Sequence, residues 1–369
     1  MGKTLIWITP DSFMDTDFHI VPQLYNHFYI HWIVLQSNKS RFSKKNIDCV
    51  ISDCKNIQVE YIKDKYRQRN PLRLFVNCKI LYKIRCLNPD AIYLNLSAGF
   101  WDLFMIPFLK SKNTVVTAHQ GKVHIGMAHK KIVGAIRKMW YEHFKNVNMF
   151  SRSQAELFKI DFPNSKIFQF VLGLKDFGPA NNQRPMTGDV RFLSFGTLNY
   201  AKNVDLLIDA ACMLYEDGVR GFKVSINGSC NDWSWYQQRI KNPEIFELNI
   251  RMIDNSEIPN LFNGAHYLVQ PYRVVSQSGP TKIAYNYNLP VIVSNLPGFM
   301  DELENGVNGY SFECGNVESL ANRMRQLIEN HQAEYPRLIE RMKLYTEEHY
   351  TKETLTAQYI NMIEEVIRL

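Results

Sequence analysis

The hydrophobic positions fall into short apolar runs separated by stretches with helical spacing, and this alternation occurs in both halves of the chain. In the first half we expect strands at Thr4–Ile8, His31–Leu35, Ala91–Asn95 and Thr114–Ala118. Val133–Phe144 has its apolar residues at helical spacing and predicts a helix. Strands that alternate with helices are typical of parallel βαβ units.

The same alternation restarts after Asp176–Gly188, a stretch rich in Pro, Gly and Asn that we interpret as an interdomain linker. Further strands are expected at Val190–Ser194, Lys223–Ile226, His266–Gln270, Val291–Ser294 and Tyr310–Phe312. Further helices are expected at Asn203–Leu214, Val317–Glu329 and Lys352–Ile367.

The pattern predicts an N-terminal domain over residues 1–180 and a C-terminal domain over residues 185–349. A final helix over about residues 350–369 is a candidate to pack back on the N-terminal domain. The predicted fold class is α/β, with two Rossmann-like, doubly wound domains facing each other across a cleft. In such sheets ligands bind beyond the carboxyl ends of the strands.

Composition narrows the class of protein. The 369 residues are 46% hydrophobic and 21% charged, which suits two globular α/β domains. No apolar run reaches the ~18 residues of a transmembrane helix, and the first run meets Pro10 and Asp11 without a cleavage site, as a strand does and a signal peptide does not. The 7 cysteines are scattered and form no C-x-x-C pair. We therefore expect a cytoplasmic protein with no metal site, disulfide framework or cofactor.

Charge is divided unevenly along the chain. Residues 1–180 carry 26 Lys and Arg against 13 Asp and Glu, a net of +13, whereas residues 181–369 have a net of −6. A single cluster such as Lys44-Lys45 is explained by a solvated surface, but an imbalance across a whole half favours an anionic partner. We expect a phosphate-bearing acceptor or peripheral association with the inner face of an anionic membrane. No nucleic-acid-binding module is recognisable, so no nucleic acid partner is expected.

The strongest candidate for a binding site is the segment Val269–Ala284, in which a buried strand gives way to a polar loop and then to a helix. Ser278 is a good N-cap, Gly279 allows a ligand to approach the backbone, and Pro280 suits the first helical turn. A helix N-terminus at the end of a parallel strand is an anion site. The alternative is a well-capped helix without a ligand.

A second candidate segment is Phe192–Asp205, where a strand ends at Phe195-Gly196 and a polar loop leads to Lys202. A lysine in this position can act as a point charge for a diphosphate, although a surface lysine is the alternative. The turn Asn227-Gly228 follows the next strand and is mostly structural.

A third candidate segment is Leu289–Tyr310, which contains a strand, Gly298 and a short acidic turn. Asp301 or Glu302 could accept hydrogen bonds from sugar or ribose hydroxyls, or both carboxylates could simply be solvated.

These three segments, in this order and at these separations, resemble the donor domain of glycosyltransferase family 4, which has the GT-B fold. The matching residues are Gly196-Thr197-Leu198 with Lys202-Asn203, then Pro271-Tyr272 with Gln277-Ser278-Gly279 and Ala284, then Pro290-Val291-Ile292 with Gly298, Asp301, Gly306 and Gly309. The resemblance implies donor contacts from Gly196, Thr197, Asn199, Lys202, Asn227, Gly228, Tyr272, Gln277, Ser278, Gly279, Pro280, Asp301 and Glu302. It further implies catalytic roles for Lys202 and Asp301.

In the donor domain the chain departs from the family pattern at four positions. Many family members carry two glutamates eight residues apart, and the matching residues here are Val275 and Ile283. Thr197 stands where an arginine is common, and Asp301 stands where a glutamate is usual. A subset with Ser-Gln-Ser-Gly in the loop also lacks the glutamates and looks like transferases that build polysaccharides and glycolipids.

In the N-terminal half, Thr114–Gly121 resembles the family's strand that ends in His-Asp near the point of sugar transfer, with Gln120 in place of Asp. The resemblance implies that His119 is catalytic and that Gln120 and His124 lie on the acceptor side. A structural histidine is the alternative for His119. Asp17, in the first helix, could face the acceptor, or it could cap that helix.

The resemblance implies a retaining, metal-independent glycosyltransferase of the hexosyltransferase type. Such an enzyme moves a sugar from a nucleotide diphosphate sugar to a glycan or lipid-linked acceptor in cell-surface polysaccharide biosynthesis. Lys202 and the helix N-terminus at Ser278-Gly279 would stabilise the departing diphosphate. The alternatives are a sugar-nucleotide epimerase of similar fold and a catalytically silent binding subunit of a transferase complex. The missing glutamates argue against the epimerase and favour the silent subunit, whereas Lys202 and the Ser278-Gly279 turn argue against the latter.

Overall fold

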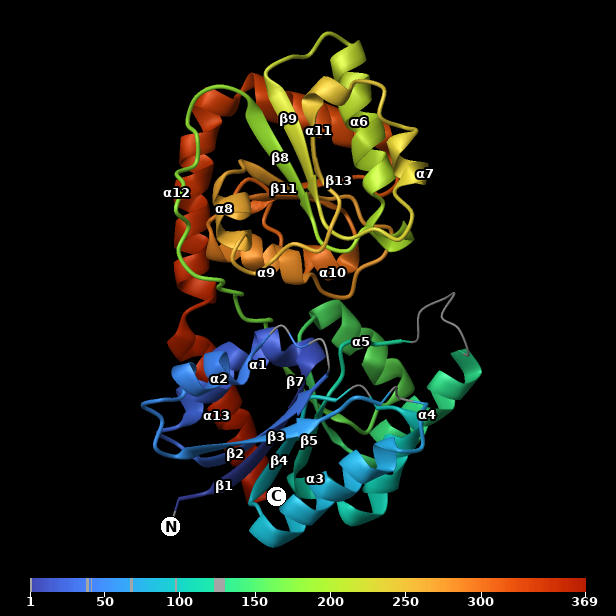
Figure 1. The fold of residues 1–369 in the computed structure, drawn as a ribbon, viewed down its shortest axis with the longest axis vertical. Coiled ribbons are helices and arrows are strands. Elements are labelled where there is room, and N and C mark those ends of the chain that lie inside the picture. Colours follow the sequence, from blue (N-terminus) through green and yellow to red (C-terminus); the bar gives the residue numbers. More distant parts are fainter. Residues whose placement is uncertain (1, 38–39, 41, 67–68, 97, 123–129) are drawn as a thin grey trace. The chain divides into compact units, whose positions relative to one another are not determined.

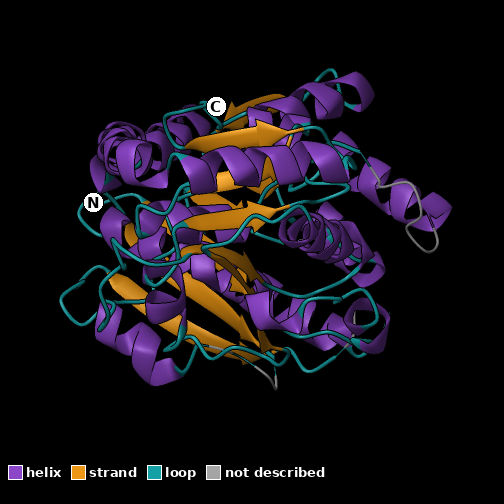
Figure 2. Ribbon diagram, turned by 90° about the horizontal axis from the view of Figure 1, so that it is seen from above, coloured by secondary structure: helices purple, strands orange, loops and turns teal. Residues whose placement is uncertain are grey.

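A computed structural model describes residues 2–37, 40, 42–66, 69–96, 98–122 and 130–369. It divides the chain into two compact units: unit 1 comprises Met1–Gly173 and Lys352–Leu369, and unit 2 comprises Leu174–Thr351. In the described part of the chain each unit contains one parallel sheet with helices packed around it (Figures 1 and 2). No described helix is long and apolar enough to cross a membrane.

Unit 1 contains a seven-stranded parallel sheet in the order β3-β2-β1-β4-β5-β6-β7. The strands are β1 Thr4–Pro10, β2 Tyr29–Gln36, β3 Ile57–Lys63, β4 Ala91–Leu94, β5 Thr114–Thr117, β6 Asn146–Met149 and β7 Lys166–Gln169. The α-helices are α1 Met14–Ile20, α2 Lys44–Val50, α3 Arg73–Leu87, α4 Lys130–His143, α5 Arg152–Asp161 and α13 Lys352–Arg368. The 3₁₀ helices are η1 Asp11–Phe13, η2 Val21–Leu24, η3 Phe100–Phe108 and η4 Ser111–Asn113.

The core of unit 1 is completed by a helix from the far end of the sequence. Helix α13, red in Figure 1, buries Leu355, Tyr359 and Ile363 in the same cluster as Leu5 and Trp7 of β1. Strands covered by helices on both faces need apolar side chains on both faces, which explains the continuous apolar run of β1. Unit 1 therefore depends on residues that are separated by all of unit 2 in the sequence.

Unit 2 contains a six-stranded parallel sheet in the order β10-β9-β8-β11-β12-β13. The strands are β8 Val190–Phe195, β9 Phe222–Asn227, β10 Phe246–Asn249, β11 Tyr267–Gln270, β12 Val291–Ser294 and β13 Gly309–Phe312. The α-helices are α6 Val204–Glu216, α7 Ser234–Gln237, α8 Ile258–Asn263, α9 Gly279–Asn286, α10 Pro297–Met300, α11 Val317–Glu329 and α12 His331–His349. The 3₁₀ helices are η5 Tyr200–Lys202 and η6 Pro243–Ile245.

Both sheets have the doubly wound strand order, and the predicted α/β fold class is therefore confirmed. In unit 1 the direction of winding reverses between β1 and β4, and in unit 2 it reverses between β8 and β11. The carboxyl ends of the strands at these reversal points are where such sheets bind ligands.

The stretch Asp176–Gly188 contains no helix or strand and belongs to unit 2. Arg184 anchors it by donating hydrogen bonds of 2.9 Å to the carbonyl oxygens of Asn288 and Tyr287.

Candidate functional site

The first part of the site in unit 2 is a glycine turn at the end of β8. A Cβ atom on Gly228 would lie 1.8 Å from the carbonyl oxygen of Gly196, so only glycine fits there. Gly196 itself has a φ of +118°, which favours glycine. The amide of Asn227 donates to Ser225 Oγ at 2.9 Å and accepts from Asn249 Nδ2 at 2.8 Å. Asn227 and Gly228 therefore shape and support the Gly196 turn.

Beyond Gly196 the loop is open to solvent. Thr197 and Asn199 are exposed, and Asn199 Oδ1 accepts a hydrogen bond of 3.0 Å from the backbone of Ala201 to cap η5. The ammonium group of Lys202 lies 3.7 Å from the centroid of the Tyr272 ring, which is a cation–π contact. No carboxylate among the described residues forms an ion pair with Lys202. The loops after β8 and β11 thus meet at the reversal point of the sheet, with a lysine between them.

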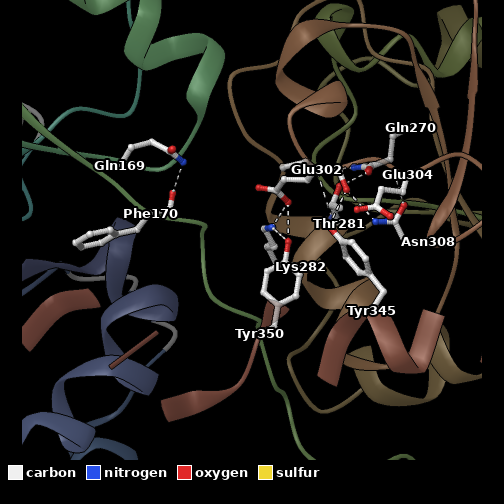
Figure 3. A network of polar contacts seen from close by, with 11 residues as sticks. Gln169, Phe170, Gln270, Thr281, Lys282, Glu302, Glu304, Asn308, Tyr345 and Tyr350 are labelled. Carbon is white, nitrogen blue, oxygen red and sulfur yellow. Dashed lines mark hydrogen bonds and ion pairs between the residues drawn. The ribbon is translucent and has the colours of Figure 1, made fainter. Parts of the chain in front are cut away.

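The second part of the site is the N-terminus of α9, and the predicted cap is confirmed. Ser278 is the N-cap, and its hydroxyl oxygen accepts from the backbone N–H of Thr281 at 3.3 Å. The buried amide of Gln270 fixes this cap, because its Nε2 donates to Ser278 Oγ at 2.6 Å and its Oε1 accepts from Thr281 Oγ1 at 2.6 Å (Figure 3). Nε2 of Gln270 also donates to the hydroxyl of Tyr272. The start of α9 is therefore held rigidly to the end of β11.

A further lysine, Lys175, lies at the N-terminus of α9. A Cβ atom on Gly279 would be 3.1 Å from Lys175 Nζ, and Lys175 is buried. A Cβ atom on Gly196 would be 3.9 Å from Cγ of Pro280, which brings the glycine turn of β8 against the first turn of α9. Sequence reasoning missed Lys175, because it precedes the predicted linker and carries no motif.

The loop before α9 contains polar atoms without partners. Gln277 Nε2 and Ser276 Oγ are buried and have no hydrogen-bond partner among the described residues. Buried polar groups in native proteins normally have partners, so such atoms suit a ligand that is bound in the loop. Gly298, predicted in the third segment, packs against this loop, because a Cβ atom there would lie 2.7 Å from the carbonyl oxygen of Val275.

The acidic turn after α10 supplies a buried ion pair. Lys282 of α9 donates to Glu302 and, at 2.7 Å, to the hydroxyl of Tyr350, which in turn donates to Glu302 at 3.0 Å (Figure 3). Burial lowers the pKa of Lys282, and the Glu302 carboxylate opposes this shift. The Glu302 carboxylate thus already has Lys282 and Tyr350 as partners. Asp301 directly follows α10 and is only partly buried.

In unit 1 the predicted residue Asp17 is fully buried at the reversal point of the sheet. Its carboxylate accepts from Trp7 Nε1 at 2.8 Å and from Thr9 Oγ1 at 2.6 Å, and Asn95 Nδ2 donates to both its oxygens. Helix α1 has no side-chain cap, so the helix-capping interpretation of Asp17 is wrong.

The predicted residue His119 follows β5 and joins this network. Its Nε2 lies 3.3 Å from Asn95 Oδ1, and its ring stacks on Phe13 at 3.9 Å between centroids. Asn95 therefore links His119 to the buried carboxylate of Asp17. The adjacent Gln120 is partly buried, and its carbonyl oxygen accepts from Arg137 at 2.8 Å. His124 lies outside the described residues.

We expect the stability of unit 1 to fall as the pH rises from about 4 to about 6. Burial raises the pKa of Asp17 from 3.8 to about 6, although the hydrogen bonds from Thr9, Trp7 and Asn95 lower it. The folded state therefore binds the proton more tightly than the unfolded state. The stabilisation from this bound proton is complete below the pKa that Asp17 has in the unfolded chain. It is lost as the pH rises through the pKa that Asp17 has in the folded protein. The expected loss is about 3 kcal/mol.

This prediction is measured by urea unfolding between pH 4 and pH 8, followed by tryptophan fluorescence because Trp7 belongs to the network. Asp17→Asn removes the titrating group and should flatten the curve over this range. An equal pH dependence in the variant and the natural protein would show that Asp17 does not titrate there.

The chain resembles known proteins in two comparisons. Residues 180–346, all within unit 2, match the model of the family described as glycosyl transferases group 1. No curated protein matches the sequence.

Similar solved structures include a glycosyltransferase from Rickettsia africae, which is 15% identical with a TM-score of 0.73 and coverage of 100% of this chain and 99% of that one. Sucrose-phosphate synthase from Thermosynechococcus elongatus is 12% identical, with a TM-score of 0.74 and coverage of 99% of both chains. HepE from Anabaena, in complex with UDP and glucose, is 13% identical with a TM-score of 0.69, covering 98% of this chain and 100% of that one.

The two parallel-sheet units are thus those of the GT-B fold, as the sequence predicted. Residues 180–346 match the glycosyl transferases group 1 model, and this match together with the GT-B fold supports a glycosyltransferase.

Proposed function

We propose that the chain is a retaining glycosyltransferase of family 4 that takes a nucleotide diphosphate sugar as donor. The acceptor is a hydroxyl group of a glycan or a lipid-linked glycan, and the reaction serves cell-surface polysaccharide biosynthesis. The observation that carries this proposal is the capped α9 N-terminus at the reversal point of the unit 2 sheet, with Lys175 beside Gly279 and Lys202 over the ring of Tyr272. A helix N-terminus with two ammonium groups suits a diphosphate.

In the proposed reaction the acceptor oxygen bonds to the anomeric carbon of the sugar, on the face from which the diphosphate departs. The bond between that carbon and the diphosphate oxygen breaks, and the departing diphosphate receives the proton of the acceptor hydroxyl. Lys202, Lys175 and the N–H groups of α9 stabilise the negative charge that develops on the diphosphate. We propose that these groups act in place of a metal ion.

The remaining polar groups receive roles in sugar recognition and on the acceptor side. The buried Nε2 of Gln277 has no partner in the part of the chain that the structure describes, which suits a sugar hydroxyl in place of the missing glutamate. Asp301 is the proposed carboxylate near the sugar. His119, positioned by Asn95, is the proposed contact of unit 1 with the reacting groups, with Gln120 beside it.

The proposal is tested with a panel of UDP-, ADP- and GDP-sugars, with and without excess EDTA. Hydrolysis of each donor by water is measured, together with the stabilisation of the folded protein by that donor. HepE has been solved with UDP-glucose and a starch synthase from Arabidopsis thaliana with ADP, so these two nucleotides head the panel. We expect one donor to be hydrolysed slowly at the same rate in EDTA. Formation of an epimerised nucleotide sugar would instead support the epimerase. Donor binding without hydrolysis would support the silent binding subunit. Full dependence of activity on added Mg²⁺ or Mn²⁺ would overturn metal independence.

We further propose that unit 1 associates peripherally with an anionic membrane. The support is the net charge of +13 over residues 1–180 together with exposed aromatic side chains at Phe75 and Phe108. Flotation with anionic vesicles at low salt tests this, and protein that stays at the bottom of the gradient would refute it.

A further inference from the structure

Unit 1 contains a cavity of about 770 Å³ beside the turn that carries His119 and Gln120. Its walls come mainly from η3 and α4, and most of them are aromatic or aliphatic. The principal wall residues are Phe13, Phe100, Trp101, Ile132, Ile136 and Tyr141. Cavities of this volume with apolar walls and a few polar groups are typical of sites for small organic ligands. The walls therefore suit an apolar ligand.

Two arginines line the same cavity, and none of its described lining residues is acidic. Arg137 donates to the carbonyl oxygens of Gln120 at 2.8 Å and Gly121 at 2.6 Å, which holds its guanidinium beside the His119 turn. Arg69 is exposed at the cavity. Apolar walls that exclude water strengthen the attraction of a permanent positive charge for an anion. The two arginines thus give the cavity cationic groups that suit a phosphate group.

Large apolar side chains continue from the cavity onto the surface. Phe100 and Ile132 are 55% and 57% exposed, although both line the cavity. Phe104 and Phe108 follow on η3 and are also exposed. Exposed apolar side chains that gather in one place mark an interaction surface. An apolar chain entering the cavity would pass Phe100 and Ile132.

We propose that this cavity binds a lipid phosphate: an apolar chain ending in a phosphate group, which forms the lipid part of the acceptor. The chain lies against Phe100, Trp101 and Ile136, and the phosphate lies near Arg69 and Arg137. This inference rests on the proposed function, because it names the acceptor class of the same transferase. A free oligosaccharide suits the site less well, because most of its walls are apolar and the Thr117 hydroxyl already bonds Tyr93.

The experiment uses the full chain and short water-soluble probes: geranyl phosphate, octyl phosphate, geraniol and inorganic phosphate, each titrated by calorimetry. We expect geranyl phosphate to bind at least ten times more tightly than geraniol and than inorganic phosphate. If octyl phosphate binds as tightly as geranyl phosphate, any apolar chain suffices. If octyl phosphate binds more weakly than geranyl phosphate, the site prefers an isoprenoid chain. Binding of geranyl phosphate no tighter than inorganic phosphate would overturn the proposal.

Variants locate the binding. Ile136→Glu places a charge in the apolar wall and should weaken geranyl phosphate binding at least tenfold. Arg69→Ala should weaken binding severalfold and reduce the preference for geranyl phosphate over geraniol. Met139→Glu is the matched control, because Met139 is on the same helix, is 54% exposed and does not line the cavity. Equal affinities in the Ile136 and Met139 variants would show that the cavity is not the site.

A titration with the nucleotide selected by the donor panel runs beside these measurements, because unit 2 supplies that site. Nucleotide binding without lipid phosphate binding would refute this inference and leave the proposed function standing. Lipid phosphate binding without nucleotide binding would refute the proposed donor instead. Circular dichroism melts of each variant show whether an effect comes from misfolding.

Discussion

Replacing Gly279 by valine is expected to reduce sugar transfer by about 10²–10³-fold while the melting temperature changes by only a few degrees. A Cβ atom at this position would already lie 3.1 Å from Lys175 Nζ, so the branched side chain must displace the ammonium group. It would also cover the N–H groups at the start of α9, where we place the diphosphate. Val317 stands at the first position of the capped helix α11, so valine is compatible with such a position in this unit.

The measurement is donor affinity by calorimetry beside thermal melts and transfer rates. Glu318→Val, in the first turn of α11, is the matched control and should leave transfer unchanged. Ser278→Ala removes the cap and should cost about 1 kcal/mol of stability, together with a loss of donor affinity. If Gly279→Val lowered the melting temperature and left donor affinity intact, the turn would be purely structural.

Replacing Lys202 by alanine is expected to cost about 2–4 kcal/mol of transition-state stabilisation. The ammonium group is held over the Tyr272 ring and has no carboxylate partner among the described residues, so a diphosphate would find it available. The dissociation constant of the donor should rise, and the rate of transfer should fall.

The control for Lys202 is Lys241→Ala, because Lys241 is an exposed lysine of the same unit that pairs with Glu216. Its kinetics should match those of the natural protein. If a folded Lys202→Ala variant also had the kinetics of the natural protein, Lys202 would not be part of the site.

The central strands and the capped helix of the site could be predicted because local chemistry determines them. The predicted strand Val291–Ser294 and helix Val317–Glu329 coincide with β12 and α11. Ser278 could be recognised as a cap because a small polar residue directly precedes Gly-Pro. The edge strands β3, β7 and β10 were missed, because many of their side chains are not fully buried and their apolar runs are broken. The buried strand β6 was also missed, because Asn146 and Asn148 interrupt its apolar run.

Other parts of the site depend on tertiary packing and had no local signal. Lys175 lies in an irregular stretch, and only the fold brings its ammonium group to the start of α9. Lys282 has the sequence context of a surface lysine, yet it is buried against Glu302. The role of Asp17 on the acceptor side stays a prediction. Its partners Trp7 and Thr9 are two residues apart on β1, and their common face became visible only in the sheet.

The placement of α13 in unit 1 has a consequence for biosynthesis. A ribosome makes the chain from its N-terminus, and domains generally fold in that order as they emerge. Unit 2 is one continuous stretch and can complete its core once Thr351 has been made. Unit 1 must wait for Leu355, Tyr359 and Ile363, which are translated after all of unit 2. The half of the enzyme that is synthesised first is therefore the half that finishes folding last.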